Sequence, residues 1–96
     1  MAEYRFTRRA ARDLEAIAEY TIDRFGIEQA RHYRDQLGEC LEQLADNPGL
    51  GRRAEQLSAG LRRYEYRSNI IFYQAIDSEI MIVRVLHYRM DVRRHL

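Results

Sequence analysis

Residues 70–86 of this 96-residue chain read IIFYQAIDSEIMIVRVL. Two apolar runs rich in β-branched residues, 70–76 and 80–86, flank the polar pair Asp77-Ser78, a pattern typical of a β-hairpin with a tight turn. Because both runs are apolar at nearly every position, each strand is expected to be covered on both faces. The hairpin is therefore predicted to form the centre of a sheet.

Two further strands are predicted, one directly before the hairpin and one at the N-terminus. From 61 to 67, tyrosines alternate with charged residues, which predicts a strand with one covered side, and Ser68-Asn69 is expected to turn the chain into the hairpin. Residues 2–6 alternate in the same way and predict a short N-terminal strand. The segment 50–60 has no clean period and is expected to be an exposed connection with a short turn of helix.

Two helices are predicted between the first strand and this connection. Thr7 is expected to cap the first helix, and Gly26 follows where a left-handed residue would end it. A second periodic run starts at once, and Pro48 ends it. The apolar stripes are Ala10, Leu14, Ile17, Thr21 and Phe25 in the first helix and Ala30, Tyr33, Leu37, Leu41 and Leu44 in the second. Because the link is so short, the helices are expected to pack antiparallel.

These elements predict a single α+β domain over residues 1–96. It consists of an N-terminal strand, an antiparallel helical hairpin and a three-stranded antiparallel meander, with the helices packed on one face of the sheet. The opposite face of the two apolar strands is then expected to be covered by a partner protein. No apolar run approaches the length of about 20 residues that a membrane span requires, and the first residues carry no apolar signal region, so a cytoplasmic location is expected.

The charge pattern is unusual because the 16 basic residues other than histidine are all arginine. With a formal net charge of +1, the chain as a whole is not predicted to bind nucleic acid electrostatically. The arginines gather near residues 5–12, 52–67 and 84–94, and these groups would engage an acidic partner if they met on one face. Codon usage in a GC-rich genome is the preferred explanation for the missing lysines, and selection for phosphate or carboxylate recognition is the alternative.

Short motifs run from one end of the chain to the other. The longest are YRFTRRAA at 4–11 and RVLHYRMD at 84–91. Between them lie Asp13-Leu14 with Ile17, Tyr20-Thr21, Phe25-Gly26, Gln29-Ala30 with Tyr33, Asn47-Pro48 with Gly51-Arg52, Gly60-Leu61-Arg62 and Ile71-Phe72-Tyr73. In order and spacing these motifs resemble those of the ParE toxins, and the string at 84–91 is the most specific of them.

The resemblance implies a RelE/ParE-like fold and the toxin of a type II toxin–antitoxin system. Such a toxin is held inactive in a hetero-oligomer by a ParD-type antitoxin and, once released, inhibits DNA gyrase and blocks replication. It implies no cofactor, no membrane and no sequence-specific nucleic acid. The C-terminal end is tied to toxicity in this family, so the expected target-binding residues are His87, Arg89, Met90, Asp91, Arg93, Arg94 and Leu96. The expected antitoxin-binding residues are Tyr20, Phe25, Tyr33, Arg62, Ile80, Ile82 and Arg84, although each apolar one would otherwise be core.

RNA cleavage is the alternative function, because RelE-type toxins share this fold and cut messenger RNA on the ribosome. The His87-Tyr88 pair is similar to that of YoeB, a nuclease of the RelE branch. Such a site needs a base, an acid and cations around the phosphate, for which Arg84, His87 and Tyr88 are the candidates. His87 also belongs to the ParE motif, and the RelE type relies on lysines, so gyrase inhibition without catalysis is preferred. His87 and His95 lack a suitable carboxylate and predict no metal site.

Overall fold

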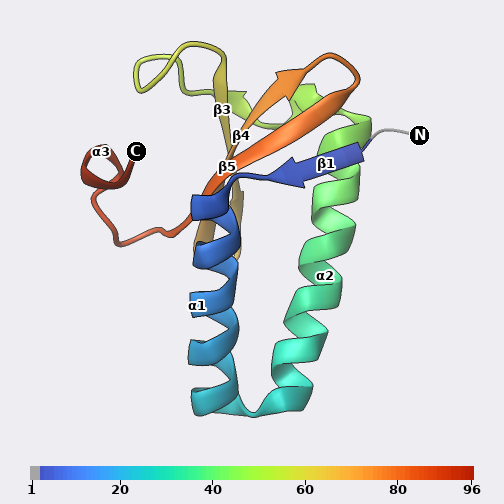
Figure 1. Ribbon diagram of the computed structural model, residues 1–96, viewed down its shortest axis with the longest axis vertical. Helices are drawn as coiled ribbons and strands as arrows, with labels where there is room; N and C mark the ends of the chain where they lie inside the picture. The colour runs from blue at the N-terminus through green and yellow to red at the C-terminus, as the bar shows by residue number, and fades with distance from the viewer. Residues whose placement is uncertain (1–2) are drawn as a thin grey trace.

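A five-stranded sheet in the order β1-β5-β4-β3-β2 lies at the centre of the computed structural model, which describes residues 3–96 (Figure 1). The elements are β1 Glu3–Phe6, α1 Arg8–Phe25, α2 Ile27–Asp46, the 3-10 helix η1 Pro48–Leu50, β2 Arg52–Arg53, β3 Leu61–Tyr66, β4 Asn69–Ile76, β5 Glu79–His87 and α3 Val92–His95. The hairpin of α1 and α2 packs on one face of the sheet, so the predicted α+β class is confirmed.

The predicted central hairpin is confirmed as β4 and β5, which pair antiparallel. The turn lies at Asp77, whose φ of 55° is the left-handed conformation that Asp tolerates in tight turns. β1 runs parallel to β5, with Phe6 opposite Ile82, and ends there. The remainder of β5 therefore continues without β1 beside it.

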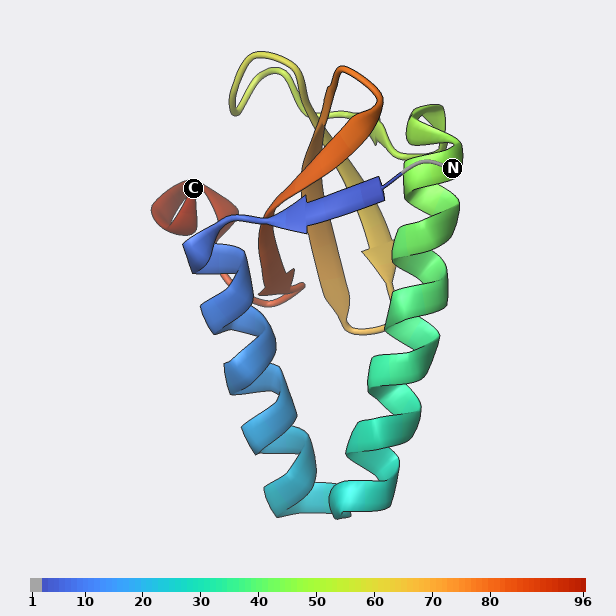
Figure 2. The same cartoon turned by 45° about the vertical axis from the view of Figure 1, so that its right-hand side comes forward.

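The predicted caps of the helical hairpin are also confirmed. The Thr7 hydroxyl oxygen accepts a hydrogen bond from the Ala10 N–H at 3.1 Å and donates to the Val83 carbonyl at 2.8 Å, which fixes the start of α1 against β5. Gly26 joins α1 to α2 with φ 90°, a conformation that favours glycine. Figure 2 shows that this link lies well beyond the end of the sheet.

Apolar side chains form a core on each face of the sheet. On the front face, which we define as the face toward α1 and α2, the strands contribute Ile71, Tyr73, Ile80, Ile82 and Val85. On the back face, the strands contribute Leu61, Ile70, Phe72 and Leu86. Both central strands are thus buried on two sides, as their continuous apolar sequence predicts.

The back face is covered by the chain itself, so the prediction that a partner protein covers it is wrong. Val92 and Leu96, from the C-terminal segment, and Leu57, from the connection before β3, pack against the back core. The C-terminal residues fold as α3 and lie beside the start of α1 (Figures 1 and 2). In the part of the chain that the structure describes, no helix is both long and apolar enough to span a membrane.

Two local predictions need correction. The connection 50–60 contains the short strand β2, which pairs with β3, and two residues are too few to show an alternation in the sequence. The turn before β4 is formed by Arg67, with φ 54°, and Ser68, whereas Asn69 is already the first residue of the strand. Residue 2 of the predicted N-terminal strand lies outside the described residues.

Candidate binding groove

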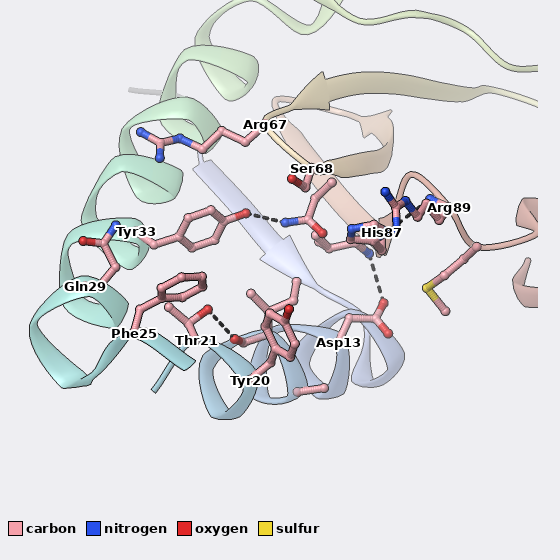
Figure 3. Close-up of a pocket in the computed structure, with 15 residues that line it drawn as sticks. Asp13, Tyr20, Thr21, Phe25, Gln29, Tyr33, Arg67, Ser68, His87 and Arg89 are labelled. Carbon is pink, nitrogen blue, oxygen red and sulfur yellow. Dashed lines mark hydrogen bonds between the residues drawn. The ribbon is translucent and has the colours of Figure 1, made fainter. Parts of the chain in front are cut away.

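A groove of about 730 Å³ lies between the helical hairpin and the end of β5 (Figure 3). Its lining residues are Asp13, Ala16, Ile17, Tyr20, Thr21, Phe25, Gln29, Tyr33, Arg67, Ser68, Asn69, Val85, His87, Arg89 and Met90. One wall comes from α1 and α2, and the other from the β3–β4 turn and the residues that follow β5.

The groove is open because α1 leaves the sheet along its length. Among residues 8–25 only Ala10 is fully buried, Ile17 is half-buried, and Tyr20 and Phe25 are 57% and 65% exposed. These residues continue the apolar stripe toward the hairpin tip, where no strand lies opposite them (Figure 2). An apolar stripe without a partner in its own chain is a typical protein-binding surface.

The wall at the β3–β4 turn is polar and rigid. The Asn69 side-chain amide donates to the Tyr33 hydroxyl, and Asn69 itself is only 7% exposed. The Arg67 guanidinium lies 6.0 Å from the centre of the Tyr33 ring. Burial raises the pKa of the phenol of Tyr33, which reaches this wall from α2, above its usual value of 10.0.

The wall after β5 is formed by exposed side chains that hold one another in place. The His87 Nδ1 accepts a hydrogen bond from the Arg89 backbone N–H at 3.1 Å, and the His87 and Tyr88 rings lie 4.7 Å apart. The Arg89 Nε donates to the Tyr88 hydroxyl at 3.1 Å, with the guanidinium 5.5 Å from the ring centre. Met90 follows directly, so an imidazole, a guanidinium and a thioether line the groove together at His87, Arg89 and Met90.

Beneath this wall, a buried ion pair joins α1 to β5. The Arg84 Nε and Nη2 donate to the two carboxylate oxygens of Asp13 at 2.7 and 2.8 Å, and the Val85 backbone N–H donates to the same carboxylate at 3.0 Å. The Arg84 Nη1 donates to the His95 carbonyl. Arg84 is only 8% exposed, and its hydrogen bonds with Asp13 raise the pKa of the guanidinium. Arg84 therefore holds α1, β5 and α3 together.

The sequence and this architecture match a known toxin family. The family profile described as "ParE toxin of type II toxin-antitoxin system, parDE" matches residues 4–92. The chain belongs to the ParE toxin family. It is 42% identical to Toxin ParE1 of Caulobacter vibrioides over 96 residues, which is 100% of this chain and 99% of the relative. It is 36% identical to Toxin ParE1 of Mycobacterium tuberculosis, over 99% of this chain and 98% of the relative.

Solved structures agree with the ParE assignment. "Chromosomal ParDE TA system from P. aeruginosa" superposes with a TM-score of 0.74 at 27% identity and covers 91% of this chain and 95% of that one. The isolated E. coli RelE toxin superposes with a TM-score of 0.64 at 17% identity over 100% of both chains, a likeness that shows the fold alone. The predicted ParE resemblance and RelE/ParE-like fold are thus confirmed.

Three of the residues predicted to bind an antitoxin, Tyr20, Phe25 and Tyr33, line the groove of this ParE-family toxin. They come from both helices of the hairpin, and the Tyr33 hydroxyl reaches the Asn69 side chain at the start of β4 (Figure 3). The structure thus brings predicted antitoxin-binding residues and predicted target-binding residues into a single groove.

The other residues predicted to bind an antitoxin lie elsewhere. Ile80 and Ile82 are 1% and 0% exposed in the front core, so they are not available to a partner. Arg84 is engaged by Asp13, and Arg62 donates to the Gly51 carbonyl at 2.6 Å beside β2, outside the groove. The pattern of β5 did not reveal its covered face, because both of its faces are apolar.

The residues predicted to bind the target divide into two groups. His87, Arg89 and Met90 lie at the groove, whereas the remaining four belong to α3 or flank it. The Asp91 carboxylate caps α3 by accepting from the Arg93 N–H at 3.1 Å, and Leu96 packs on the back core. The side chains of Arg93 and Arg94 are exposed.

Sequence reasoning missed several groove residues, of which Asp13 is the most informative. A carboxylate three residues after Ala10 and four before Ile17 lies next to the apolar stripe of α1, which signals a buried ion pair. Asn69 was assigned to a turn and therefore not considered. Across residues 3–96, no group of three or more His, Cys, Asp or Glu side chains is placed to hold a metal ion.

Proposed function

We propose that a ParD-type antitoxin neutralises this ParE-family toxin by occupying the groove, and that the released toxin inhibits DNA gyrase by binding through the same wall. The observation that carries the proposal is that His87, Arg89 and Met90 share one groove with Tyr20 and Phe25. A segment that fills the groove covers both groups, so binding of the antitoxin excludes the target directly.

The helical wall suits an antitoxin segment that folds on binding. Such a segment needs apolar side chains to anchor on, because burial of apolar surface offsets the entropy lost on ordering. Tyr20 and Phe25 supply these anchors, since more than half of each side chain is exposed in the free toxin. The similarity to a ParDE system supports a ParD-type partner.

The opposite wall suits a protein target rather than an RNA substrate. In an RNA-cleaving site, Arg84 would have to neutralise the charge of the scissile phosphate. Its hydrogen bonds go instead to the Asp13 carboxylate and the His95 carbonyl. His87, Arg89 and Met90 instead form an exposed cluster of the kind found in protein interfaces, where aromatic residues, Met and Arg are enriched. We assign the contacts with the target protein to these three residues. Asp91 and Leu96 hold α3 in place, and the exposed side chains of Arg93 and Arg94 belong to a separate surface of the toxin.

The target is tested with the purified toxin in a gyrase supercoiling and DNA-cleavage assay, beside a cell-free translation reaction probed for cut messenger RNA. Trapped cleaved DNA with intact messages is expected. Unaffected gyrase with cut messages would overturn the proposal and move the activity to RNA cleavage.

The shared groove is tested by measuring antitoxin affinity calorimetrically. Phe25→Ala removes a ring that is 65% exposed, so its loss is expected to cost about 1–2 kcal/mol, or about 5- to 30-fold in Kd. Ile76→Ala is the matched control, because Ile76 is 47% exposed but does not line the groove. Equal effects of the two variants would contradict the groove assignment.

Arg89→Ala combined with Met90→Ala tests whether target and antitoxin share the wall. This variant is expected to lose gyrase inhibition and also to weaken antitoxin binding. It is preferable to truncation of the C-terminal residues, since Val92 and Leu96 cover the back core and their loss would destabilise the fold. Full gyrase inhibition by the double variant would refute the target assignment.

A further inference from the structure

Five exposed arginines from opposite ends of the chain lie on two adjoining elements, the first turns of α1 and the C-terminal α3. The Arg9 Nη2 donates to the His95 carbonyl at 2.7 Å, which fixes α3 beside the first turns of α1 (Figures 1 and 2). Positions three and four apart share one side of a helix, so Arg12 is a neighbour of Arg9, and Arg8 is a neighbour of Arg12, along the first turns of α1. The set, here called the basic patch, consists of Arg8, Arg9, Arg12, Arg93 and Arg94, all exposed.

The charge of the basic patch is not neutralised within residues 3–96. None of its arginines forms an ion pair with a carboxylate there, whereas Arg31 and Arg34 on α2 pair with neighbouring acidic residues. The acidic side chains nearest in the chain are engaged elsewhere or unpaired: Asp13 binds Arg84, Asp91 caps α3, and Glu15 forms no ion pair with the patch. The patch is therefore a local concentration of positive charge on a chain whose net charge is +1.

The position of these arginines is unfavourable for the fold. The N-terminal end of a helix carries a partial positive charge, which favours acidic residues, yet the first turn of α1 has none. Arg8 and Arg9 place further positive charge at this end. Like charges gathered at such a site indicate a surface that binds an anion, since folding alone disfavours them.

The chemistry of the patch fits a phosphate backbone better than a protein segment. A protein segment that folds on binding requires apolar anchors, but beside the patch Ala10 lies in the front core and Val92 and Leu96 pack on the back core. Guanidinium groups bind phosphate oxygens in pairs of parallel hydrogen bonds, without reading base sequence.

We propose that the basic patch binds the phosphate backbone of duplex DNA without sequence specificity. The choice of DNA over RNA rests on the proposed function, because gyrase works on bound duplex DNA that a docked toxin would meet. The patch lies on α1 and α3, outside the groove residues Tyr20 and Phe25, so the toxin contacts protein through the groove and DNA through the patch.

Salt dependence of DNA binding tests this proposal without gyrase. The probe is a fluorescently labelled duplex of about 20 base pairs, and its anisotropy is measured with purified toxin at several salt concentrations. Five phosphate contacts predict a slope of log K against log salt of about −4.5, from a contribution of about 0.9 for each contact. Affinity should then fall by about 500-fold over a fourfold increase in salt.

Two double variants, Arg8→Gln with Arg12→Gln and Arg93→Gln with Arg94→Gln, each remove two contacts. The slope should become shallower by about 1.8 in each case. Arg9 is left in place because it holds the His95 carbonyl. The matched control is Arg31→Gln with Arg34→Gln on α2, which changes the net charge equally and should leave the slope unchanged. Thermal unfolding confirms that each variant is folded.

Three outcomes would overturn the proposal. One is an equal change of the salt-dependence slope in the patch and control variants, which would mean that DNA binding depends only on the net charge of the toxin. Another is patch-dependent binding of a polyglutamate peptide without binding of DNA, which would assign the patch to an acidic protein. The third is binding of single-stranded RNA alone. Patch-dependent DNA binding by a toxin that leaves gyrase unaffected would support the patch while refuting the proposed target.

Discussion

The buried ion pair of Asp13 and Arg84 makes the strongest prediction about stability. The Asp13→Ala substitution removes a carboxylate that accepts three hydrogen bonds, and the side chains of Arg84 and Asp13 are only 9% and 14% exposed. The arginine would be left as a buried charge without a counterion, which costs about 3–5 kcal/mol. A domain of this size is stable by about 5–15 kcal/mol, so the variant should lose a large part of its stability.

The cost should come mainly from the orphaned charge, because a buried ion pair adds little over apolar residues of similar volume. Adding Arg84→Met to Asp13→Ala should therefore recover about 2 kcal/mol or more. Asp35→Ala is the control: its pair with Arg34 has side chains 73% and 68% exposed, and such a pair contributes at most about 1 kcal/mol.

The assay is urea unfolding followed by circular dichroism, with the transition slope compared among the variants. The single substitution should lower the midpoint strongly, and the double substitution should raise it again. If Asp13→Ala cost no more than Asp35→Ala, or if adding Arg84→Met gave no recovery, the central role of this ion pair would be refuted.

Three further predictions concern single positions. Gly38→Ala should raise the free energy of unfolding by about 0.5–1 kcal/mol in the same urea assay, since Gly38 lies within α2 and an added Cβ has no neighbour within 4 Å. Gly51→Ala should instead lower it by about 1–3 kcal/mol, because its Cβ would meet the Tyr73 hydroxyl and lie 2.8 Å from the Arg63 carbonyl oxygen; an unchanged midpoint would contradict this close approach. Burial raises the pKa of the Tyr73 phenol in the folded protein above 10.0. The contribution of this phenol to the free energy of unfolding is therefore fully present below pH 10. It is lost as the pH rises further, because the phenol of the unfolded chain ionises first. Stability measured from pH 8 to 11 should accordingly fall less steeply for Tyr73→Phe than for the wild type, and equal slopes would argue against this burial effect.

Local signals predicted the elements with strong sequence patterns. The two apolar runs 70–76 and 80–86 are short, rich in β-branched residues and separated by a tight turn, which favours buried neighbouring strands. Thr7 and Gly26 mark the ends of α1 through local backbone chemistry. These features are determined by residues close together in the chain, so one sequence suffices to find them.

Features that depend on long-range contacts escaped prediction. α3 and its C-cap together have only two apolar residues, Val92 and Leu96, whose spacing of four is too short a pattern to indicate a helix. The position of α3 follows from hydrogen bonds with Arg9 and Arg84. The misassignment of Ile82 has the same origin, because Ile82 lies in the front core with residues of α1 and α2 that are far away in the chain.

The candidate site was predicted in outline but not as one groove. Tyr20 and Phe25 are predicted as antitoxin contacts near the helical hairpin, and His87 and Arg89 as target contacts through the family motif. Their meeting depends on α1 running past the end of the sheet, which periodicity alone does not show. Arg84 was given a surface role, although a single charge within an apolar strand is a signal of a buried partner.

The motif at residues 84–91 combines structural and exposed residues because of where β1 ends. The Thr7 N–H donates to the Ile82 carbonyl and the Thr7 hydroxyl to the Val83 carbonyl, after which β5 has no strand on that side. Asp13 of α1 takes over by binding Arg84 and the Val85 N–H, which holds the helix against the strand. Beyond this contact, α1 and the chain after β5 diverge and the groove opens. The ion pair that stabilises the domain therefore also sets the position of the groove walls, so a substitution at Asp13 should weaken antitoxin binding even where the protein stays folded.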